Sequence, residues 1–511
     1  MLLSVLSATL LGCTSAVLAA PTVQFGGTTL KGTTSGLGAV EFFGGIPFAL
    51  PPVVNSINTT NFDATSFGPA CAQPPSSSPV GATAEDCLFL NIFRPKGTTK
   101  TDSLPVMAWI YGGGFRSGQT SIYDATDLVA QSVTRGTPVI YVSIAYRLGP
   151  LGFPQGAEAA RRGATNLGLK DQLTGMKWIQ NHISTFGGDP SKVTIFGESA
   201  GAISITDLFF NSNLEKLARA AIFESGSRGS NTFQDALRRQ PVWDTFVANL
   251  PSCAGSTTAT NSNDVYDAQT VAQNSLNEVF QWVPVIDGPG GHYAKLPFIS
   301  GTNSTKVRHL NTTEEILASC AAFYQPFLDP IPKWFADDMT EFFALYPDNP
   351  AAGSPFGTGN ETFGTGAEYK RGAALMGDAA FQAPRRAWIQ AASKAGVPAF
   401  GYLFADQNVV PALFPYLGVY HSTEISYAYG TVQQTTLNPQ VKQLSSAMMD
   451  YWLSFATSLT PNDGKGTPRS TWPQYTPGSQ NQTFAELAII PDTYRADGIG
   501  FVISHPSTFG Q

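Results

Sequence analysis

Short apolar runs rich in β-branched residues recur along the chain and alternate with longer segments of helical pattern. Runs of the first kind cover residues 106–110, 139–144 and 193–196, and one helical segment covers residues 171–183. Such runs predict strands that are buried on both faces, and their alternation with helices is typical of a mostly parallel sheet flanked by helices. We therefore predict an α/β fold whose functional groups gather at the carboxyl ends of the strands.

The third of these runs leads into a G-x-S-x-G sequence, Gly197-Glu198-Ser199-Ala200-Gly201. After a strand, this sequence predicts a strained turn into a helix that pushes the serine outward as a nucleophile. The glycines let the chain turn sharply and let a substrate carbonyl approach without meeting a Cβ atom. Glycine and serine are common in loops, so the motif is weak alone, but its position after a strand makes Ser199 a strong candidate nucleophile.

Composition and charge exclude one class of partner. The chain has 511 residues, of which 42% are hydrophobic and 13% charged, and its net charge is −7. Its 30 Lys and Arg residues are scattered along the sequence. Nucleic-acid binding would need a basic face to neutralise phosphates, so no nucleic-acid partner is expected.

The first residues predict a secretory signal. Residues 1–12 form an apolar run too short to span a bilayer, and Val17-Leu18-Ala19 is a small-residue cleavage pattern. We predict a signal over residues 1–19, secretion, and no stable membrane anchor. The alternative is a lipoprotein box, Leu10-Leu11-Gly12-Cys13, which would attach a lipid to Cys13. Five N-x-S/T sequons suit a glycosylated secreted protein, and they lie at Asn58, Asn303, Asn311, Asn360 and Asn481.

Loss of the signal would leave four cysteines in an oxidising compartment: Cys71, Cys87, Cys253 and Cys320. Four cysteines allow three pairings. The short loop from Cys71 to Cys87 favours a bridge between these two. A pairing of Cys253 with Cys320 would follow by elimination, and the spacing does not decide it.

Several further segments, in a fixed order, carry a family resemblance. They are Gly44-Gly45-Ile46-Pro47-Phe48-Ala49, Glu85-Asp86-Cys87-Leu88-Phe89-Leu90-Asn91-Ile92, Tyr111-Gly112-Gly113-Gly114-Phe115, Ala145-Tyr146-Arg147-Leu148-Gly149-Pro150-Leu151-Gly152-Phe153 and Asn166-Leu167-Gly168-Leu169-Lys170-Asp171-Gln172. Together with residues 186–201 they resemble the type-B carboxylesterase and lipase family, secreted α/β-hydrolases that include fungal lipases and cholinesterases. The resemblance runs over residues 23–501. It implies a single α/β-hydrolase domain over residues 20–511, catalysis without metal or cofactor, and a Cys71–Cys87 disulfide.

The glycine-rich segment implies an oxyanion hole. Gly113 and Gly114 follow the 106–110 strand and match the family's oxyanion loop, and the backbone N–H of Ala200 would be the third donor. Most family members have His at the first position of this motif, where this chain has Tyr111. The alternative is a glycine-rich turn without a chemical role.

The candidate base comes from a downstream segment. Gly418-Val419-Tyr420-His421-Ser422-Thr423-Glu424 resembles the family's G-x-x-H-x-x-E segment and follows the nucleophile, as the order of the triad requires. We therefore expect His421 to be the base. Glu424 is interpreted as a buried carboxylate that pins this loop.

The third member of the triad is missing from its expected place. The resemblance puts the family's catalytic glutamate at position 306, where this chain has Lys306. A carboxylate there holds the imidazole in one tautomer and stabilises the imidazolium, whereas an ammonium opposes its protonation. Glu224 is a weak replacement candidate. Glu314 and Glu315 are others, although Thr312 and Glu315 have the form of a helix capping box.

The leading functional hypothesis is a secreted serine hydrolase of carboxylic esters, with a small-molecule ester as substrate. Ser199 would be acylated, His421 would carry the proton, and no cofactor would take part. Two alternatives stay open. One is a degenerate hydrolase kept as a binding protein, which the lysine at 306 suggests. The other is a tailoring enzyme that transfers or cyclises an acyl group and differs only in the acceptor.

Overall fold

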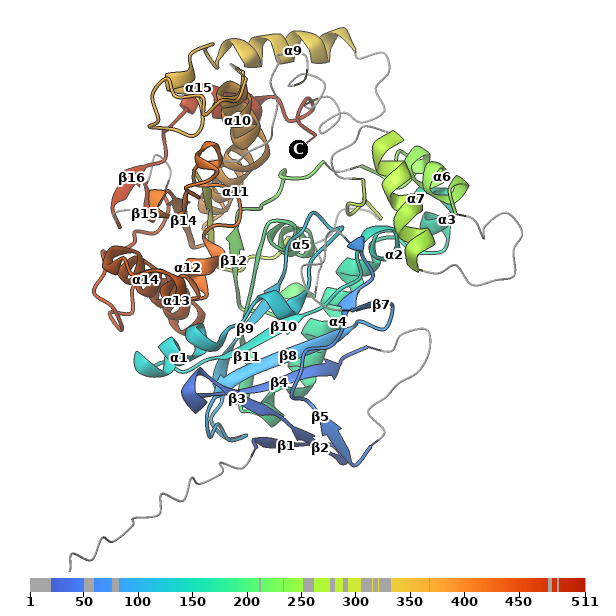
Figure 1. Ribbon diagram of the computed structural model, residues 1–511, viewed down its shortest axis with the longest axis vertical. Coiled ribbons are helices and arrows are strands. Elements are labelled where there is room, and N and C mark those ends of the chain that lie inside the picture. Colours follow the sequence, from blue (N-terminus) through green and yellow to red (C-terminus); the bar gives the residue numbers. More distant parts are fainter. Residues whose placement is uncertain are drawn as a thin grey trace, which may run out of the picture.

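Figure 1 shows a computed structural model of the chain. The structure describes residues 20–49, 59–75, 82–210, 213–232, 234–250, 262–275, 281–287, 293–304, 315, 320, 332–366, 368–476, 480–484 and 487–510. Within them, no helix is long and apolar enough to cross a membrane.

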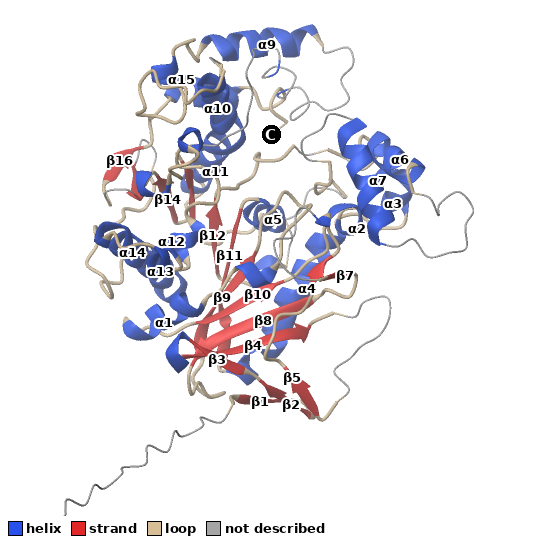
Figure 2. Cartoon of the chain, in the orientation of Figure 1, coloured by secondary structure: helices blue, strands red, loops and turns tan. Residues whose placement is uncertain are grey.

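One sheet of eleven strands runs through the molecule (Figure 2). In spatial order its strands are β16 (Ile489–Pro491), β15 (Gln480–Phe484), β14 (Ala399–Phe404), β13 (Phe298–Asn303), β12 (Ala220–Glu224), β11 (Gly188–Glu198), β9 (Leu104–Ile110), β10 (Ile140–Ile144), β8 (Phe89–Pro95), β4 (Val40–Pro47) and β3 (Thr33–Ser35). The strands from β10 to β15 in this order are parallel, and those at the two edges are antiparallel. The predicted mostly parallel sheet is therefore confirmed.

The three apolar runs of the sequence form neighbouring strands. Residues 106–110 lie in β9, residues 140–144 form β10 and residues 193–196 lie in β11. All of these residues are buried. This two-sided burial explains why the runs are continuously apolar rather than alternating.

Helices cover both faces of the sheet. The helices in the described part of the chain are α1 (Thr126–Thr134), α2 (Gly149–Gly152), α3 (Gly156–Arg161), α4 (Leu167–His182), α5 (Ala200–Leu208), α6 (Gln240–Ala248), α7 (Ser262–Ser275), α9 (Lys333–Ala344), α10 (Tyr369–Gly377), α11 (Ala383–Lys394), α12 (Ile425–Ala428), α13 (Val432–Thr435), α14 (Pro439–Ser458) and α15 (Ala496–Ser504). The predicted helix at 171–183 is the greater part of α4. Ile144 of β10 lies so close to Gly175 of α4 that a Cβ on the glycine would meet Ile144 Cγ2 at 2.5 Å. Tyr141, three residues earlier and hence on the opposite face, contacts the ring of Tyr429.

The small strands lie apart from the main sheet. β1 (Thr22–Phe25), β2 (Thr28–Lys31) and β5 (Asn61–Asp63) form one sheet, and β6 (Ala70–Cys71) pairs with β7 (Thr83–Ala84). A second apolar cluster joins side chains of α9, α10 and α15 at the end of the molecule drawn uppermost in Figure 1.

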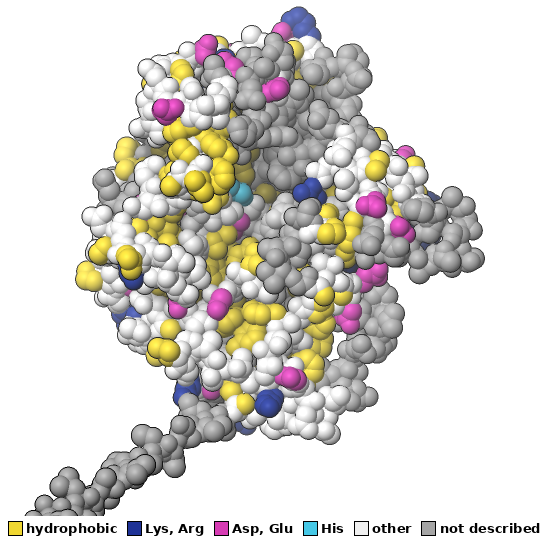
Figure 3. Space-filling view, in the orientation of Figure 1, with side chains coloured by type: hydrophobic (Ala, Val, Ile, Leu, Met, Phe, Trp, Pro, Cys, Tyr) yellow, Lys and Arg dark blue, Asp and Glu magenta, His cyan; other side chains and the backbone are white. Residues whose placement is uncertain are grey.

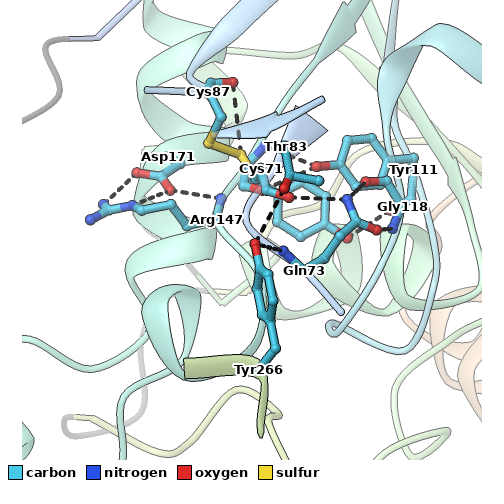
Figure 4. The surroundings of a disulfide bond; sticks show 10 residues. Cys71, Gln73, Thr83, Cys87, Tyr111, Gly118, Arg147, Asp171 and Tyr266 are labelled. Atoms are coloured by element: carbon cyan, nitrogen blue, oxygen red, sulfur yellow. Dashed lines mark hydrogen bonds and ion pairs between the residues drawn. A yellow bond between two sulfur atoms is a disulfide. The ribbon is translucent and has the colours of Figure 1, made fainter. Parts of the chain in front are cut away.

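The disulfide predicted between Cys71 and Cys87 is present (Figure 4). The pairing of Cys253 with Cys320 is not confirmed. Cys320 is a buried thiol whose Sγ donates to Met376 Sδ at 3.5 Å, so it is not half of a disulfide. Cys253 lies outside the described residues.

Candidate active site

The candidate site residues gather at the carboxyl ends of adjacent parallel strands, as expected for an open α/β sheet. The Gly112–Gly114 loop follows β9, Ser199 follows β11 and Ser225 follows β12. Asn303 is the last residue of β13, and the loop that carries His421 comes after β14. The sheet thus brings together groups that lie more than 300 residues apart in sequence.

Ser199 lies on a sharp turn between β11 and α5. Its φ of 54° and ψ of −125° are strained for a residue with a side chain. A Cβ on Gly201 would lie 2.0 Å from the carbonyl oxygen of Ile110, and one on Gly197 would lie 2.5 Å from it. The glycines of the motif are therefore required by the close approach of β9, and the turn projects the serine away from the strand.

His421 faces this serine. Its Nε2 lies 2.7 Å from Ser199 Oγ, which is hydrogen-bonding distance. The His421 side chain is 32% exposed, so a substrate and water can reach it. In the tautomer with an unprotonated Nε2, Ser199 donates to this nitrogen, the arrangement that a general base needs.

A third group, which the sequence did not indicate, lies beside this pair. Glu198 Oε1 lies 3.2 Å from His421 Nε2, and its side chain is only 3% exposed. Ser422 Oγ donates to the same oxygen at 2.7 Å. A carboxylate this close favours the protonated form of an imidazole. Since Glu198 approaches Nε2 rather than Nδ1, it does not occupy the place of a triad acid.

The glycine loop packs directly against the turn. A Cβ on Gly112 would lie 2.8 Å from Ser199 Cβ, and one on Gly113 would lie 2.0 Å from the carbonyl oxygen of Ser117. Gly113 and Gly114 have φ values of 117° and 63°. Ala200 is the first residue of α5, where backbone N–H groups have no carbonyl partner within the helix. The three residues predicted to bind an oxyanion therefore border one space next to Ser199.

Tyr111 stands where most of the family has His, and its contacts stabilise the structure around the glycine loop. Its ring is fully buried and stacks on that of Tyr146 with centroids 4.5 Å apart. Each hydroxyl donates to the backbone carbonyl of the other residue, at 3.0 and 2.8 Å. The reciprocal bonds fix the start of the glycine loop.

A glutamine next to the disulfide holds the other end of this loop (Figure 4). Gln73 Nε2 donates to Gly118 O and Gly118 N donates to Gln73 Oε1, both at 2.9 Å. The backbone N of Gln73 in turn donates to the hydroxyl of Tyr266 in α7 at 3.0 Å. The disulfide segment and α7 therefore hold the end of the glycine loop in place through Gln73.

The loop that carries His421 is anchored by buried polar contacts. Glu424 accepts from Ser225 Oγ at 2.5 Å and from Asn303 Nδ2 at 2.8 Å. Asn303 Nδ2 also lies 2.5 Å from Tyr420 O and 3.0 Å from Thr423 Oγ1. Glu424 is fully buried, which confirms the interpretation that this carboxylate pins the loop.

The replacement acid named from the sequence is not in place. Glu224 is fully buried and its Oε1 accepts from Trp452 Nε1 at 2.8 Å. Burial, together with the carboxylates of Glu424 and Glu198, raises the pKa of Glu224 well above its ordinary value. In the described residues it makes no hydrogen bond or ion pair with His421. Lys306 and Glu314 lie outside the described residues, and Glu315 is exposed.

A cavity of about 640 Å³ opens above Ser199 and His421. Its described walls are mainly apolar and aromatic, with the glycine loop, Glu198 and a few hydroxyl and amide groups among them; the larger apolar side chains are Phe115, Ile122, Tyr123, Ile203, Val283, Phe381 and Ile425. Figure 3 shows hydrophobic side chains gathered beside an exposed histidine on a hollowed face. No group of three or more His, Cys, Asp and Glu side chains in the described part of the chain is arranged to hold a metal ion.

The sheet is mostly parallel and has helices on both faces. It carries a strained serine, an imidazole within hydrogen-bonding distance of that serine, and a glycine loop beside them. This combination defines the class of α/β-hydrolases. The family model of the carboxylesterase family matches residues 15–326 and 357–497, and the chain belongs to this family. This confirms the resemblance drawn from the sequence motifs.

Individual relatives agree with this assignment. Secreted lipase 1 of Botryotinia fuckeliana is 33% identical, over 96% of this chain and 94% of its own length. Lipase 2 of Geotrichum candidum is 32% identical, over 90% of this chain and 92% of its own length. The solved structure of PNB esterase superposes with a TM-score of 0.74 at 26% identity, covering 94% of this chain and 99% of that one. The α/β-hydrolase fold is thus confirmed.

Proposed function

We propose that the protein hydrolyses carboxylic esters through an acyl-enzyme formed on Ser199. The observation that carries this proposal is the 2.7 Å contact between His421 Nε2 and Ser199 Oγ at a strained turn. Membership of a family whose named relatives are lipases and esterases supports the same reaction.

In the first half of the reaction, Ser199 Oγ attacks the ester carbonyl carbon while its proton passes to His421 Nε2. The carbonyl oxygen becomes an oxyanion, which the backbone N–H groups of Gly113, Gly114 and Ala200 stabilise. The imidazolium then gives its proton to the alcohol oxygen as the C–O bond breaks, so the alcohol leaves and the acyl group stays on the serine.

In the second half, water takes the place of the alcohol. His421 accepts a proton from the water as its oxygen attacks the acyl carbon, and the same proton returns to Ser199 Oγ when the acid is released. Glu198 supports both halves, because its carboxylate lies 3.2 Å from Nε2 and stabilises each imidazolium electrostatically.

The direct test is turnover of p-nitrophenyl butyrate. Ser199→Ala is expected to lower kcat by at least about a thousandfold, and His421→Ala by about 10²–10⁴-fold. Ser191→Ala is the matched control, since Ser191 is an exposed serine near the start of the same strand. Equal rates in wild type and Ser199→Ala would remove this serine from the chemistry.

Two further parts of the proposal concern processing and organisation. We propose that residues 1–19 are a secretory signal and that residues 20–511 form one hydrolase domain. The main sheet supports the second statement, since its strands extend in sequence from Thr33 to Pro491. Amino-terminal sequencing of protein collected from the culture medium should start near Ala20, and a retained signal would contradict the prediction.

A further inference from the structure

A single wide turn of helix lies beside the catalytic imidazole. Residues Asp378–Gln382 form a π-helical turn between α10 and α11, in which the backbone N of Ala383 donates to the carbonyl oxygen of Asp378. In a regular α-helix, the ring of Pro384 would clash with the carbonyl of Ala380, and Pro384 has no N–H to donate to it. The proline therefore favours a wider turn here, and single π-turns are frequent at functional sites.

Both ends of this π-turn are held by side chains. The Asp378 carboxylate accepts from Arg495 Nε at 2.7 Å, and Gln382 Oε1 accepts from the hydroxyl of Tyr494 at 2.7 Å. Gln382 Nε2 in turn donates to the carbonyl oxygen of Asn303 at 3.1 Å. The side chain of this same asparagine anchors the loop that carries the catalytic imidazole. The π-turn is therefore fixed relative to that loop.

Phe381, within the π-turn, contacts the imidazole itself. The centroids of the Phe381 and His421 rings lie 5.1 Å apart, and the ring planes are tilted by 46°. Phe381 borders the catalytic cavity and also packs against the second apolar cluster, the one formed by side chains of α9, α10 and α15. The ring is thus supported by a packed core and forms a wall beside a partly exposed imidazole.

This contact gains importance once the serine is acylated. In the free enzyme the imidazole is held by the 2.7 Å hydrogen bond between Ser199 Oγ and His421 Nε2. In the acyl-enzyme Oγ has no proton to donate, yet the same nitrogen must still accept a proton from water. Glu198 attracts the imidazole strongly only after that proton has arrived, whereas the contact with Phe381 does not depend on charge. A displacement of about 1 Å can slow such a reaction by about 10²-fold.

We propose that Phe381 is a positioning residue that keeps the His421 imidazole directed at the reacting carbon while the acyl group is bound to Ser199. Deacylation then depends on Phe381 more than acylation does. The inference rests on the proposed ester hydrolysis and assigns the π-turn a role in the second half of that reaction.

The two halves of the reaction can be measured separately. The enzyme turns over saturating p-nitrophenyl butyrate, is quenched in acid, and the acylated fraction of the protein is read by intact mass spectrometry. At steady state, kcat divided by the acylated fraction is the deacylation rate constant, and kcat divided by the unacylated fraction is the acylation rate constant. p-Nitrophenolate is a good leaving group, so the acyl-enzyme should accumulate.

Phe381→Ala is expected to lower the deacylation rate constant by about tenfold and the acylation rate constant by less than about threefold. Phe381→Tyr keeps the ring and should deacylate within about twofold of wild type. Phe414→Ala is the matched control, because Phe414 is 49% exposed and is not among the described walls of the cavity. Both of its rate constants should lie within about twofold of wild type.

Phe381→Leu replaces Phe381→Ala if the alanine variant does not fold, since leucine keeps much of the apolar bulk. It should lower the deacylation rate constant by at least about threefold. Unchanged deacylation, an equal fall in both rate constants, or a change in KM alone would overturn the positioning role of Phe381. Wild type that neither turns over the ester nor becomes acylated would instead count against the proposed function.

Discussion

Asn303 Nδ2 lies 2.8 Å from Glu424 Oε2, and this buried contact joins the end of β13 to the loop that carries His421. The same amide nitrogen also reaches the carbonyl oxygen of Tyr420. The imidazole therefore owes its position opposite Ser199 partly to an asparagine two strands away from the nucleophile.

Asn303→Asp should break this anchor. The substitution replaces a donor with a carboxylate that faces Glu424 and the carbonyl oxygen of Tyr420, so both contacts become repulsive. We expect a loss of at least about 2 kcal/mol in unfolding free energy and a fall in kcat, measured by urea denaturation and by ester turnover below the melting temperature. Asn249→Asp introduces the same charge at an exposed site and should change neither quantity. Wild-type stability in Asn303→Asp would show that the contact is unimportant.

The same contacts bear on glycosylation. Asn303 belongs to a sequon, but its Nδ2, the atom that would carry a glycan, is buried and bonded within the protein. Asn360 belongs to another sequon and is exposed. Mass spectrometry of peptides from protein made in a glycosylating eukaryotic host should find Asn303 unmodified, with Asn360 as the accessible comparison. A glycan on Asn303 in active protein would be incompatible with the anchored loop.

Glu198→Gln should change the pH dependence of catalysis. The carboxylate 3.2 Å from His421 Nε2 stabilises the imidazolium, so its neutral isostere should lower kcat/KM by about tenfold or more. The acid limb of the kcat/KM profile should move to lower pH, because the imidazole loses its proton more readily without the nearby charge. Ser422→Ala removes a hydrogen bond to Glu198 but keeps the charge, and its acid limb should stay near that of wild type. An unmoved limb in Glu198→Gln would contradict the electrostatic role.

Glu224→Gln should separate stability from catalysis. Burial raises the pKa of Glu224 well above the ordinary value of 4.5, so the folded protein keeps this proton to a higher pH than the unfolded chain does. The contribution of Glu224 to stability is therefore complete below about pH 4.5 and is lost as the pH rises. Gln, which does not titrate, can still accept from Trp452. The unfolding free energy of Glu224→Gln relative to that of wild type should therefore increase as the pH rises above about 4.5, with kcat almost unchanged. A large loss of kcat would instead identify Glu224 as a member of the catalytic apparatus.

The strands, the turn that carries Ser199 and the role of His421 could be predicted because each has a local signal in the sequence. Continuous apolar runs mark strands buried on both faces, and the glycines around Ser199 reflect a close approach of the neighbouring strand. His421 carried a motif of its own. In each case a short stretch of sequence contains the physical cause.

The supporting groups had no such signal. Glu198 precedes the nucleophile in sequence, but its contact with His421 depends on where a loop more than 200 residues later returns to the sheet. Asn303 looked only like a sequon, since its donor role requires Glu424 to arrive from another element. Long-range packing, rather than local pattern, determines these positions.

The activation of Ser199 by His421 is tested most directly by covalent labelling with a fluorophosphonate, followed by mass mapping of the labelled peptide. One adduct per molecule is expected on Ser199, formed rapidly in wild type, much more slowly in His421→Ala and not at all in Ser199→Ala. An unlabelled wild-type protein, or an adduct on any other residue, would contradict the claim that His421 activates Ser199 for acylation.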